Sequence, residues 1–476
     1  MPSASLPPTV SSQKPKLVVD NVHGDIRLTT QEWRIVDTAS FQRLRSLKQL
    51  QMGHLVYPNA THTRFAHSVG VRAIMERILN RVKIKQAAKP KLLLAALLHD
   101  IGHYPYSHLM ENVDRVVLTE ESLKAGAVGE KVDLHQSESA YPDHEELGRE
   151  IVSKQPDLLG AIGSQELASE VGHLFSRTKI ADQQLSKLIH SSLDMDRMDY
   201  LIRDSRAAGV PYGNIDINYL LNQVRMSRSG MLGIEHKALA AAEHLLLARS
   251  FVFRVVCQHK TTYGLEEAAR QLLCRIRKKG LYKLPTKRKD ILDLVTSKQL
   301  PTFTDAYLDQ IFIQASTHTD AVIKSLARSI TSRRPPRLLK EIRAFSKKDE
   351  KYGQGALFLR DCKQGLQSLA ASSGVPAGQF LICELPSIGF EARGPNVAAA
   401  EALKMKEEGA EEMIKVFWPE EAKEPTDIVD VPHSMFHVIG DYVFRTYRLY
   451  VAYPEDDQDE VVAQLRQKVA HWGKDS

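Results

Sequence analysis

His99 and Asp100 are the residues best placed to do chemistry, because they end the apolar run Leu92–Leu98. Burying an ionised aspartate beside a histidine costs several kcal/mol unless the two are paired or bind a metal. Gly102 is expected to end the helix and to open space beyond it. The pair then offers one nitrogen and one oxygen ligand to a single ion. The alternative is that the pair lies on the protein surface. Further candidate ligands elsewhere in the sequence would favour the metal site.

Two distant segments supply such partners. His67 lies in the string HTRFAHSVG and is expected to open a helix. Asp196, Asp199 and Tyr200 are spaced i, i+3 and i+4 in DMDRMDYLIRD, so they share one face of a helix. Two imidazoles and two carboxylates suit Fe, Mn, Zn, Ni or Co more than Ca. The predicted ligand set is His67, His99, Asp100 and Asp196.

The elements that position these residues are predicted to be helical. Residues 16–28 alternate like a β-hairpin, Thr30 is expected to cap a helix, and 35–45 reads as one helix. Helical periodicity then dominates to about residue 345. Residues 118–143, rich in Gly, Ser, Glu and Lys, are expected to form a surface excursion.

The pattern changes after the basic run 332–337. Short β-type runs follow at 380–386, 413–418, 436–440 and 442–453, with helices expected over 396–409 and 458–471. We predict a mostly α fold in which a helical body carries a smaller α+β C-terminal lobe. The expected division is a flexible lead-in over 1–15, the helical body over 16–345 and the lobe over 346–476.

Composition narrows the class of protein. The 476 residues are 43% apolar, yet the longest uncharged apolar run is too short for the ~20 residues of a membrane helix. The four cysteines lack C-x-x-C spacing, which argues against a zinc ribbon or a disulfide scaffold. We therefore expect a cytoplasmic protein without membrane contact. The net charge of +6 suits anionic ligands and permits nucleic-acid binding without requiring it.

The candidate metal ligands and the strings around them resemble those of a known family. The order H…HD…D resembles the metal signature of the HD phosphohydrolase superfamily. The strings VHGDIRL, FQRLRSLKQL, HTRFAHSVGV, HDIGHYPYSH, DHEE, DMDRMDYLIRD and ARSFVFRVVCQHK are similar to the deoxynucleoside-triphosphate triphosphohydrolases that also carry a sterile-alpha-motif domain. That domain is expected to be absent here, because only about 15 residues precede the first motif.

The resemblance implies roles for individual residues. It makes His67, His99, Asp100 and Asp196 the metal ligands, and His108 the donor of a proton to the departing 5′ oxygen. His144 lines the same pocket, and His103 is expected near it. A histidine is the natural proton donor near neutral pH. For any one of these histidines alone, a structural hydrogen-bonded role is the alternative.

The resemblance also implies how a nucleotide binds. Guanidinium groups would grip the phosphates, and other side chains would close on the sugar. Cys257 stands where the family places a tyrosine against the 2′ carbon, which leaves room for a 2′ hydroxyl; deoxynucleotides remain the expected substrates. The phosphate-binding residues are Arg64, Arg197 and Arg249, and the sugar-binding residues are Gln49, Leu50, Tyr200, Asp204 and Cys257.

A second nucleotide site follows from the same resemblance. Lys16, Asp37, Gln42 and Arg45 match an activator site, in which a carboxylate selects guanine and the cations hold phosphates. Ordinary helix caps and surface charges are the alternative reading.

The predicted function is metal-dependent hydrolysis of dNTPs to deoxynucleoside and tripolyphosphate. We expect activation by GTP or dGTP, Mg with the nucleotide, and a homo-oligomer, either a dimer or a tetramer. One alternative is a related hydrolase that acts on an NTP, an alarmone or a nucleic-acid end. Another is a nucleic-acid-binding regulatory protein, in which the basic runs 275–289 and 333–348 would contact the nucleic acid. The native metal, the preferred base and the pathway stay open.

Overall fold

The described part of the chain is mostly helical, which confirms the predicted fold class. In this computed structural model it comprises residues 16–116, 118, 121, 140–176, 185, 188–189, 193, 195–227, 230–348, 350, 353–389, 413–419, 424–452 and 459–474. The predicted lead-in, the predicted helix over 396–409 and almost all of the excursion over 118–143 lie outside these residues. None of the helices described is both long and apolar enough to cross a membrane.

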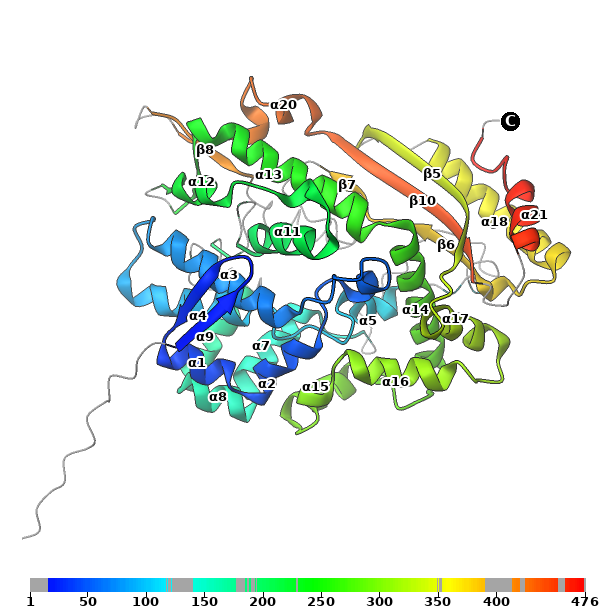
Figure 1. Ribbon diagram of the computed structural model, residues 1–476, viewed down its shortest axis with the longest axis horizontal. Helices are drawn as coiled ribbons and strands as arrows, with labels where there is room; N and C mark the ends of the chain where they lie inside the picture. The colour runs from blue at the N-terminus through cyan, green and yellow to red at the C-terminus, as the bar shows by residue number, and fades with distance from the viewer. Residues whose placement is uncertain are drawn as a thin grey trace, which may run out of the picture.

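The helices follow one another along the body and recur in the C-terminal part (Figure 1). They are α1 (Thr30–Val36), α2 (Ala39–Gln42), α3 (Arg64–Leu79), α4 (Lys89–Leu98), α5 (His108–Glu111), α7 (His144–Lys154), α8 (Pro156–Ile162), α9 (Gln165–Phe175), α11 (Met195–Ala208), α12 (Ile217–Asn222), α13 (Leu239–Val252), α14 (Lys260–Lys279), α15 (Arg288–Thr296), α16 (Asp305–Ala315), α17 (Ala321–Thr331), α18 (Gln354–Ser373), α20 (Phe436–Ile439) and α21 (Asp459–Lys468).

The strands form three small sheets within the described residues. The first is the predicted hairpin, in which β1 (Lys16–Asp20) pairs antiparallel with β2 (Gly24–Leu28). The second has the order β5-β10-β6, from β5 (Arg337–Lys347), β10 (Tyr442–Val451) and β6 (Phe380–Glu384), and β7 (Ile388–Gly389) also pairs with β10. The third has the order β3-β4-β8-β9, from β3 (Val224–Met226), β4 (Leu232–Glu235), β8 (Lys415–Phe417) and β9 (Thr426–Asp427).

Two expectations for the N-terminal helices are wrong in detail. The residue that caps α1 is Thr29, not Thr30, and its hydroxyl and Glu32 form a reciprocal capping box. The expected helix over 35–45 is broken, because the Thr38 hydroxyl accepts from the backbone N–H of Phe41 and so starts α2 as a new helix. A 3₁₀ turn over Arg43–Ser46 follows.

The C-terminal sheet packs between helices. Its runs at 380–386 and 442–453 were expected as strands and form β6 and β10, while the run at 413–418 forms β8. The run at 436–440 was also expected as a strand but forms the short helix α20. The Ser434 hydroxyl accepts from the backbone N–H of Phe436 at the start of that turn, which favours a helix over an extended chain.

The boundary between body and lobe is not a clean cut in sequence. The strand β5 begins at Arg337, before the expected lobe, and pairs along its length with β10. The strand β8 pairs parallel with β4 of the body. The division at residue 345 stays a prediction.

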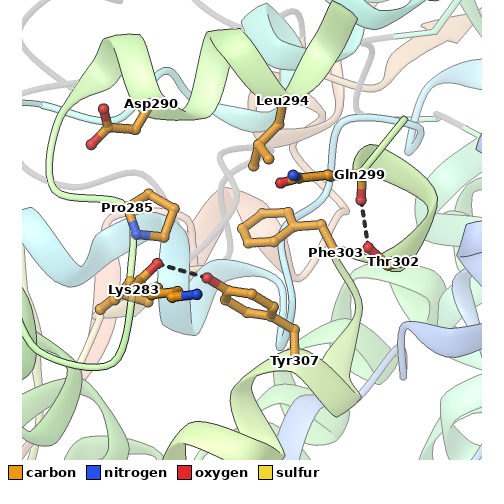
Figure 2. A pocket seen from close by; sticks show the side chains of 9 residues that line it. Lys283, Pro285, Asp290, Leu294, Gln299, Thr302, Phe303 and Tyr307 are labelled. Carbon is orange, nitrogen blue, oxygen red and sulfur yellow. Dashed lines mark hydrogen bonds between the residues drawn. The ribbon is translucent and has the colours of Figure 1, made fainter. Parts of the chain in front are cut away.

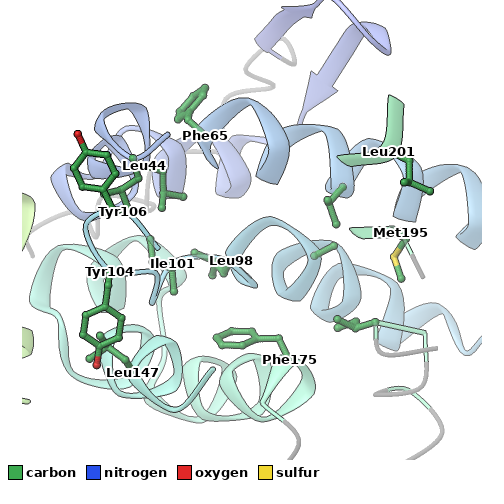
Figure 3. Close-up of a cluster of buried hydrophobic side chains, with 14 of the residues drawn as sticks. Leu44, Phe65, Leu98, Ile101, Tyr104, Tyr106, Leu147, Phe175, Met195 and Leu201 are labelled. Atoms are coloured by element: carbon green, nitrogen blue, oxygen red, sulfur yellow. The ribbon is translucent and has the colours of Figure 1, made fainter. Parts of the chain in front are cut away.

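A continuous apolar core supports the helices that carry the candidate site. Figure 3 shows Phe65 of α3, Leu98 of α4 and Leu201 of α11 among its members, with Ile101 directly after α4. These side chains are fully or almost fully buried. The helices α3, α4 and α11 are thereby held together by packing that does not involve any charged group of the site.

A cavity of about 260 Å³ lies between the loop before α15 and the start of α16, where Leu284 and Phe303 of the core line it. Figure 2 shows Lys283, Asp290, Phe303 and Tyr307 around it, with the Tyr307 hydroxyl donating to the Lys283 carbonyl oxygen. It contains none of the predicted site residues, so the candidate chemistry lies elsewhere.

Gly102 permits the closest backbone approach near the His99–Asp100 pair. A Cβ atom there would lie 2.0 Å from the carbonyl oxygen of His144 and 2.3 Å from the backbone nitrogen of Gly148, both in α7. Replacing Gly102 with alanine must therefore push α7 away from the end of α4.

We predict that Gly102→Ala destabilises the protein by about 3 kcal/mol, at the upper end for overpacking. Urea unfolding would measure this loss. Gly160→Ala is the matched control, because a Cβ there meets no atom within 4 Å and alanine favours the helix α8. Equal stability of the two variants would contradict the close approach.

Candidate metal and phosphate site

The four predicted metal ligands lie together where α3, α4 and α11 meet. His67, His99 and Asp100 each offer a ligand atom, and these atoms lie within 4.8 Å of one another. Asp196 joins them, because its Oδ1 is 2.8 Å from His67 Nε2 and 3.9 Å from His99 Nε2. Residues separated by more than 100 positions thus present two imidazole nitrogens and two carboxylates to one point.

The orientation of the imidazoles fits a metal ion. His99 Nδ1 is 2.9 Å from the carbonyl oxygen of Ala96, and His67 Nδ1 is 2.7 Å from Asp199 Oδ2. The Nε2 atom of His99 is buried and has no hydrogen-bond partner among the described residues, and the Nε2 atom of His67 faces the Asp196 carboxylate at 2.8 Å. A buried nitrogen without a partner is costly unless something binds it. This donor set, with each Nδ1 fixed behind it, is typical of transition-metal sites.

Asp199 is the residue that fixes His67, and it was not among the predicted site residues. It is fully buried and also lies 2.6 Å from His23 Nε2, while Arg203 donates to both of its oxygens. Gly70 makes room for this cluster, since a Cβ at that position would lie 2.1 Å from Asp199 Oδ1. The hairpin, α3 and α11 are therefore joined behind the metal ligand.

The charges around the ligands are strongly coupled. Burial alone would lower the pKa of His67, but hydrogen bonds to Asp196 and Asp199 override it and raise that pKa to about 10. Burial raises the pKa of Asp100, and the nearby Arg64 outweighs this and brings it well below its usual value. Because a metal needs the unprotonated His67 Nε2, binding must displace that proton.

A second group of histidines surrounds Glu111. His108 Nδ1 lies 2.6 Å from Glu111 Oε2 and His144 Nδ1 lies 2.8 Å from Oε1. His103 stacks on His144 with ring centroids 4.2 Å apart, and its Nε2 is 3.1 Å from Asp100 Oδ1. His103 thus connects this group to the metal ligands.

The two ends of this group differ in protonation. Burial lowers the pKa of His144, but the Glu111 carboxylate outweighs it and raises that pKa to about 10. Burial and the charge of Arg64 bring the pKa of His103 well below its usual value. Glu111 therefore favours the protonated form of His144, Arg64 favours the neutral form of His103, and the two rings are stacked.

The three predicted phosphate-binding arginines are buried, and Arg64 contacts a predicted metal ligand. Arg64 is buried and donates to Asp100 Oδ2 at 2.5 Å and to the Ser107 hydroxyl at 2.8 Å, so its fork already holds a ligand carboxylate. Arg197 follows Asp196 and is buried, and Arg249 is buried in α13.

The predicted sugar-binding residues are linked through a histidine that was given no role. His62 Nε2 is 2.8 Å from Asp204 Oδ1, and the His62 carbonyl oxygen accepts from the backbone N–H of Gln49. The nearby Asp204 also helps raise the pKa of the Cys257 thiol, after the larger effect of burial. Leu50 and Tyr200 are partly buried against the apolar core.

The predicted activator residues lie around α1 and α2. Lys16 Nζ stands 4.3 Å from the centre of the Trp33 ring, and the exposed Asp37 ends the same helix one turn later. Gln42 accepts from Arg45 Nε at 2.7 Å, and the Arg45 guanidinium lies 3.5 Å from the centre of the Phe65 ring, next to Arg64.

The family model described as HD domain matches residues 64–204 of this chain. The chain contains an HD domain. Its limits run from Arg64 to Asp204 and enclose all four predicted metal ligands together with the histidines around Glu111.

Curated relatives share part of this chain. It is 34% identical over 249 residues to the uncharacterized protein MJ1154 of Methanocaldococcus jannaschii, covering 52% of this chain and 46% of that protein. It is 30% identical over 268 residues to the uncharacterized protein YwfO of Bacillus subtilis, covering 55% of each. The chain spans about half the length of these relatives. The deoxynucleoside triphosphate triphosphohydrolase SAMHD1 of Homo sapiens is 29% identical over 232 residues, 44% of this chain and 36% of that protein.

Two crystal structures share the fold over nearly the whole chain. A phosphohydrolase from Bacteroides thetaiotaomicron has a TM-score of 0.67 at 21% identity and covers 92% of this chain and 100% of its own. A hypothetical protein from Aquifex aeolicus has a TM-score of 0.66 at 22% identity and covers 96% and 100%. The fold of this chain therefore recurs in both structures.

We predict that Asp199→Asn lowers the metal affinity of the HD domain by about 10- to 100-fold, because an amide orients His67 Nδ1 less well than a carboxylate does. Competition with a chelator and elemental analysis would measure it, with thermal unfolding as a check on folding. Asp293→Asn on the exposed face of α15 is the control. Unchanged metal affinity in a folded Asp199→Asn variant would show that Asp199 does not orient a ligand.

Proposed function

We propose that the chain is a metal-dependent phosphohydrolase that splits dNTPs into deoxynucleoside and tripolyphosphate. The observation that carries the proposal is the contact between the metal-ligand set and the histidines around Glu111, made by His103 with Asp100. Human SAMHD1, a deoxynucleoside triphosphate triphosphohydrolase that is similar over 44% of this chain, supports the substrate class. The proposed catalytic residues are His108, His144 and His103.

The ligand set His67, His99, Asp100 and Asp196 would hold a transition metal, which when bound polarises a phosphoryl group and lowers the pKa of water. The chain's own residues supply the proton. His108 donates from Nδ1 to Glu111, so its Nε2 atom is left to carry a proton toward a leaving oxygen. Buried Arg197 and Arg249 add positive charge for the phosphates.

Cys257 is the position on which sugar selection rests. Its side chain is smaller than the tyrosine of the related enzymes, and it lies near Asp204 and at the end of the π-helical turn Phe253–Cys257. Hydrolysis of ribonucleotides is therefore the second candidate activity. Assays with each dNTP and NTP in Mg²⁺ and Mn²⁺, with products resolved, distinguish the two. Release of pyrophosphate or orthophosphate in place of tripolyphosphate would refute the proposed cleavage.

We predict that His108→Ala keeps its metal and binds nucleotide but loses about 10²- to 10⁴-fold in kcat, because the proton donor is gone. Elemental analysis and steady-state kinetics would measure this. His173→Ala in α9 is the control. A rate equal to that of the parent would mean that another residue, such as His144, protonates the leaving oxygen.

We also propose that guanine nucleotide activates the enzyme through Lys16, Asp37, Gln42 and Arg45. Arg45 packs on Phe65 at the start of α3, so ordering this segment bears on the helix that carries His67. The coupling required is about 1–3 kcal/mol.

We predict that Asp37→Ala loses activation by GTP while it retains metal and basal activity. Turnover with and without GTP, together with light scattering, would report activation and subunit assembly. Asp25→Ala is the matched control, since Asp25 is also an exposed carboxylate and lies on the adjacent hairpin. If the parent protein is equally active with and without GTP, the four residues do not form an activator site and have only a structural role.

A further inference from the structure

The two residues that precede the candidate proton donor His108 adopt a left-handed backbone. Tyr106 has a φ of 50°, and Ser107 has a φ of 51° and a ψ of −124°. Residues other than glycine seldom adopt such angles, which persist only where the surrounding structure imposes them. Ser107 directly precedes α5, so its backbone sets the direction in which α5 starts and the positions of His108 and Glu111.

Two carboxylates of α16 hold Tyr106 in this turn. Asp305 Oδ1 accepts from the backbone N–H of Tyr106 at 2.8 Å, and Asp309 Oδ1 accepts from the Tyr106 hydroxyl at 2.6 Å. The Phe312 ring lies further along the helix, with its centroid 6.0 Å from that of the Tyr106 ring. Positions i, i+4 and i+7 on one face of α16 thus contact a single residue. Figure 3 shows the Tyr106 ring at the edge of the apolar core, with its hydroxyl pointing away from the cluster.

Asp305 holds a second segment with its other oxygen. Its Oδ2 atom accepts from the backbone N–H of Lys48 at 3.0 Å and lies 3.4 Å from Lys48 Nζ. Lys48 directly precedes Gln49, one of the predicted sugar-binding residues. The Ser107 hydroxyl in the first segment accepts from Arg64 Nε at 2.8 Å. One carboxylate therefore fixes the backbone before the candidate proton donor and before a predicted sugar-binding residue.

The hydrogen bonds of Asp305 serve the turn and not its own helix. An aspartate at the start of a helix often accepts from the free N–H groups of the first turn. Asp305 is 2% exposed, and the hydrogen bonds that it accepts from the described residues come from Tyr106 and Lys48 instead. The helix α16 also lies outside residues 64–204, which match the HD domain. A turn inside that domain is therefore held by a helix that follows it in the sequence.

The segment that leads into α16 is tied to the loop that carries His103. The buried Arg43 side chain donates to the carbonyl oxygen of Phe303 at 3.0 Å. It also donates to the carbonyl oxygens of Ile101 and His103 at 2.7 and 2.9 Å. Burial lowers the pKa of Arg43 to about 10, and the negative charge of Asp305 opposes this effect. The start of α16 is thus fixed relative to the candidate catalytic histidines.

We propose that Asp305 is a positioning residue for the candidate proton donor. By accepting from Tyr106 it holds the turn that directs His108, and by accepting from Lys48 it holds the start of the sugar-binding segment. The inference rests on the proposed hydrolase function, and it assigns Asp305 no contact with the substrate or the metal. A displacement of about 1 Å can lower a rate by about 100-fold, so the geometry of this turn bears directly on turnover.

Asp305→Asn tests the proposal, because asparagine has one accepting oxygen where the carboxylate has two. One of the two backbone N–H groups then loses its acceptor. We expect kcat for dNTPs to fall by about 10- to 100-fold, while elemental analysis shows that the metal is retained. In a His108→Ala background the same substitution should change kcat by less than about two-fold, since the group that Asp305 positions is then absent.

Asp320→Asn is the matched control. Asp320 stands at the start of α17 and, like Asp305, accepts from backbone N–H groups and from a lysine, Lys279. Thermal unfolding of both variants would separate a loss of stability from a loss of rate. The control should keep the parental kcat even where its Tm falls.

A second measurement does not require turnover. Histidine-selective NMR of the full chain would follow the ring signals of His108, which are identified by their loss in His108→Ala. Asp305→Asn should shift these signals, and Asp320→Asn should leave them in place. If Asp305→Asn does not fold, Tyr106→Phe replaces it in both measurements, since it removes only the hydroxyl that Asp309 accepts.

Three results would overturn the proposal. They are unchanged His108 signals, a parental kcat in a folded Asp305→Asn variant, and losses that multiply in full when Asp305→Asn is combined with His108→Ala. A parent protein that releases no tripolyphosphate from any dNTP would instead refute the proposed function. The NMR comparison would then still decide whether Asp305 positions His108.

Discussion

The candidate site depends on one buried carboxylate. Asp199 is closed off from solvent and contacts His67, His23 and Arg203, which come from three separate segments. Burial raises the pKa of Asp199, but these partners bring it far below its usual value, so the group stays ionised. A buried charge without partners costs several kcal/mol. The fold must therefore hold the hairpin and α11 against α3, and that requirement also fixes the imidazole that faces the metal position.

A second constraint links the metal ligands to the candidate proton donor. Gly102 lets the N-terminus of α7 approach the end of α4, which brings His144 over His103. Glu111 then binds His144 and His108 on its two oxygens. The position of His108 relative to Asp100 is thus set through backbone contact and one shared carboxylate. A substitution at Gly102 is therefore expected to displace the candidate catalytic histidines, although Gly102 itself contacts no reacting atom.

The sequence indicated most of the local elements and the four residues that the structure brings together at the candidate metal site, but not the side chains that contact them from behind. The pair His99–Asp100 stood out because a charge ended an apolar run, and Asp196 because of its helical spacing. Glu111 had a usable signal, its i+3 spacing from His108 within one turn. His23 and His62 had none, because their contacts with Asp199 and Asp204 join residues more than 140 positions apart. The roles of all these residues stay predictions.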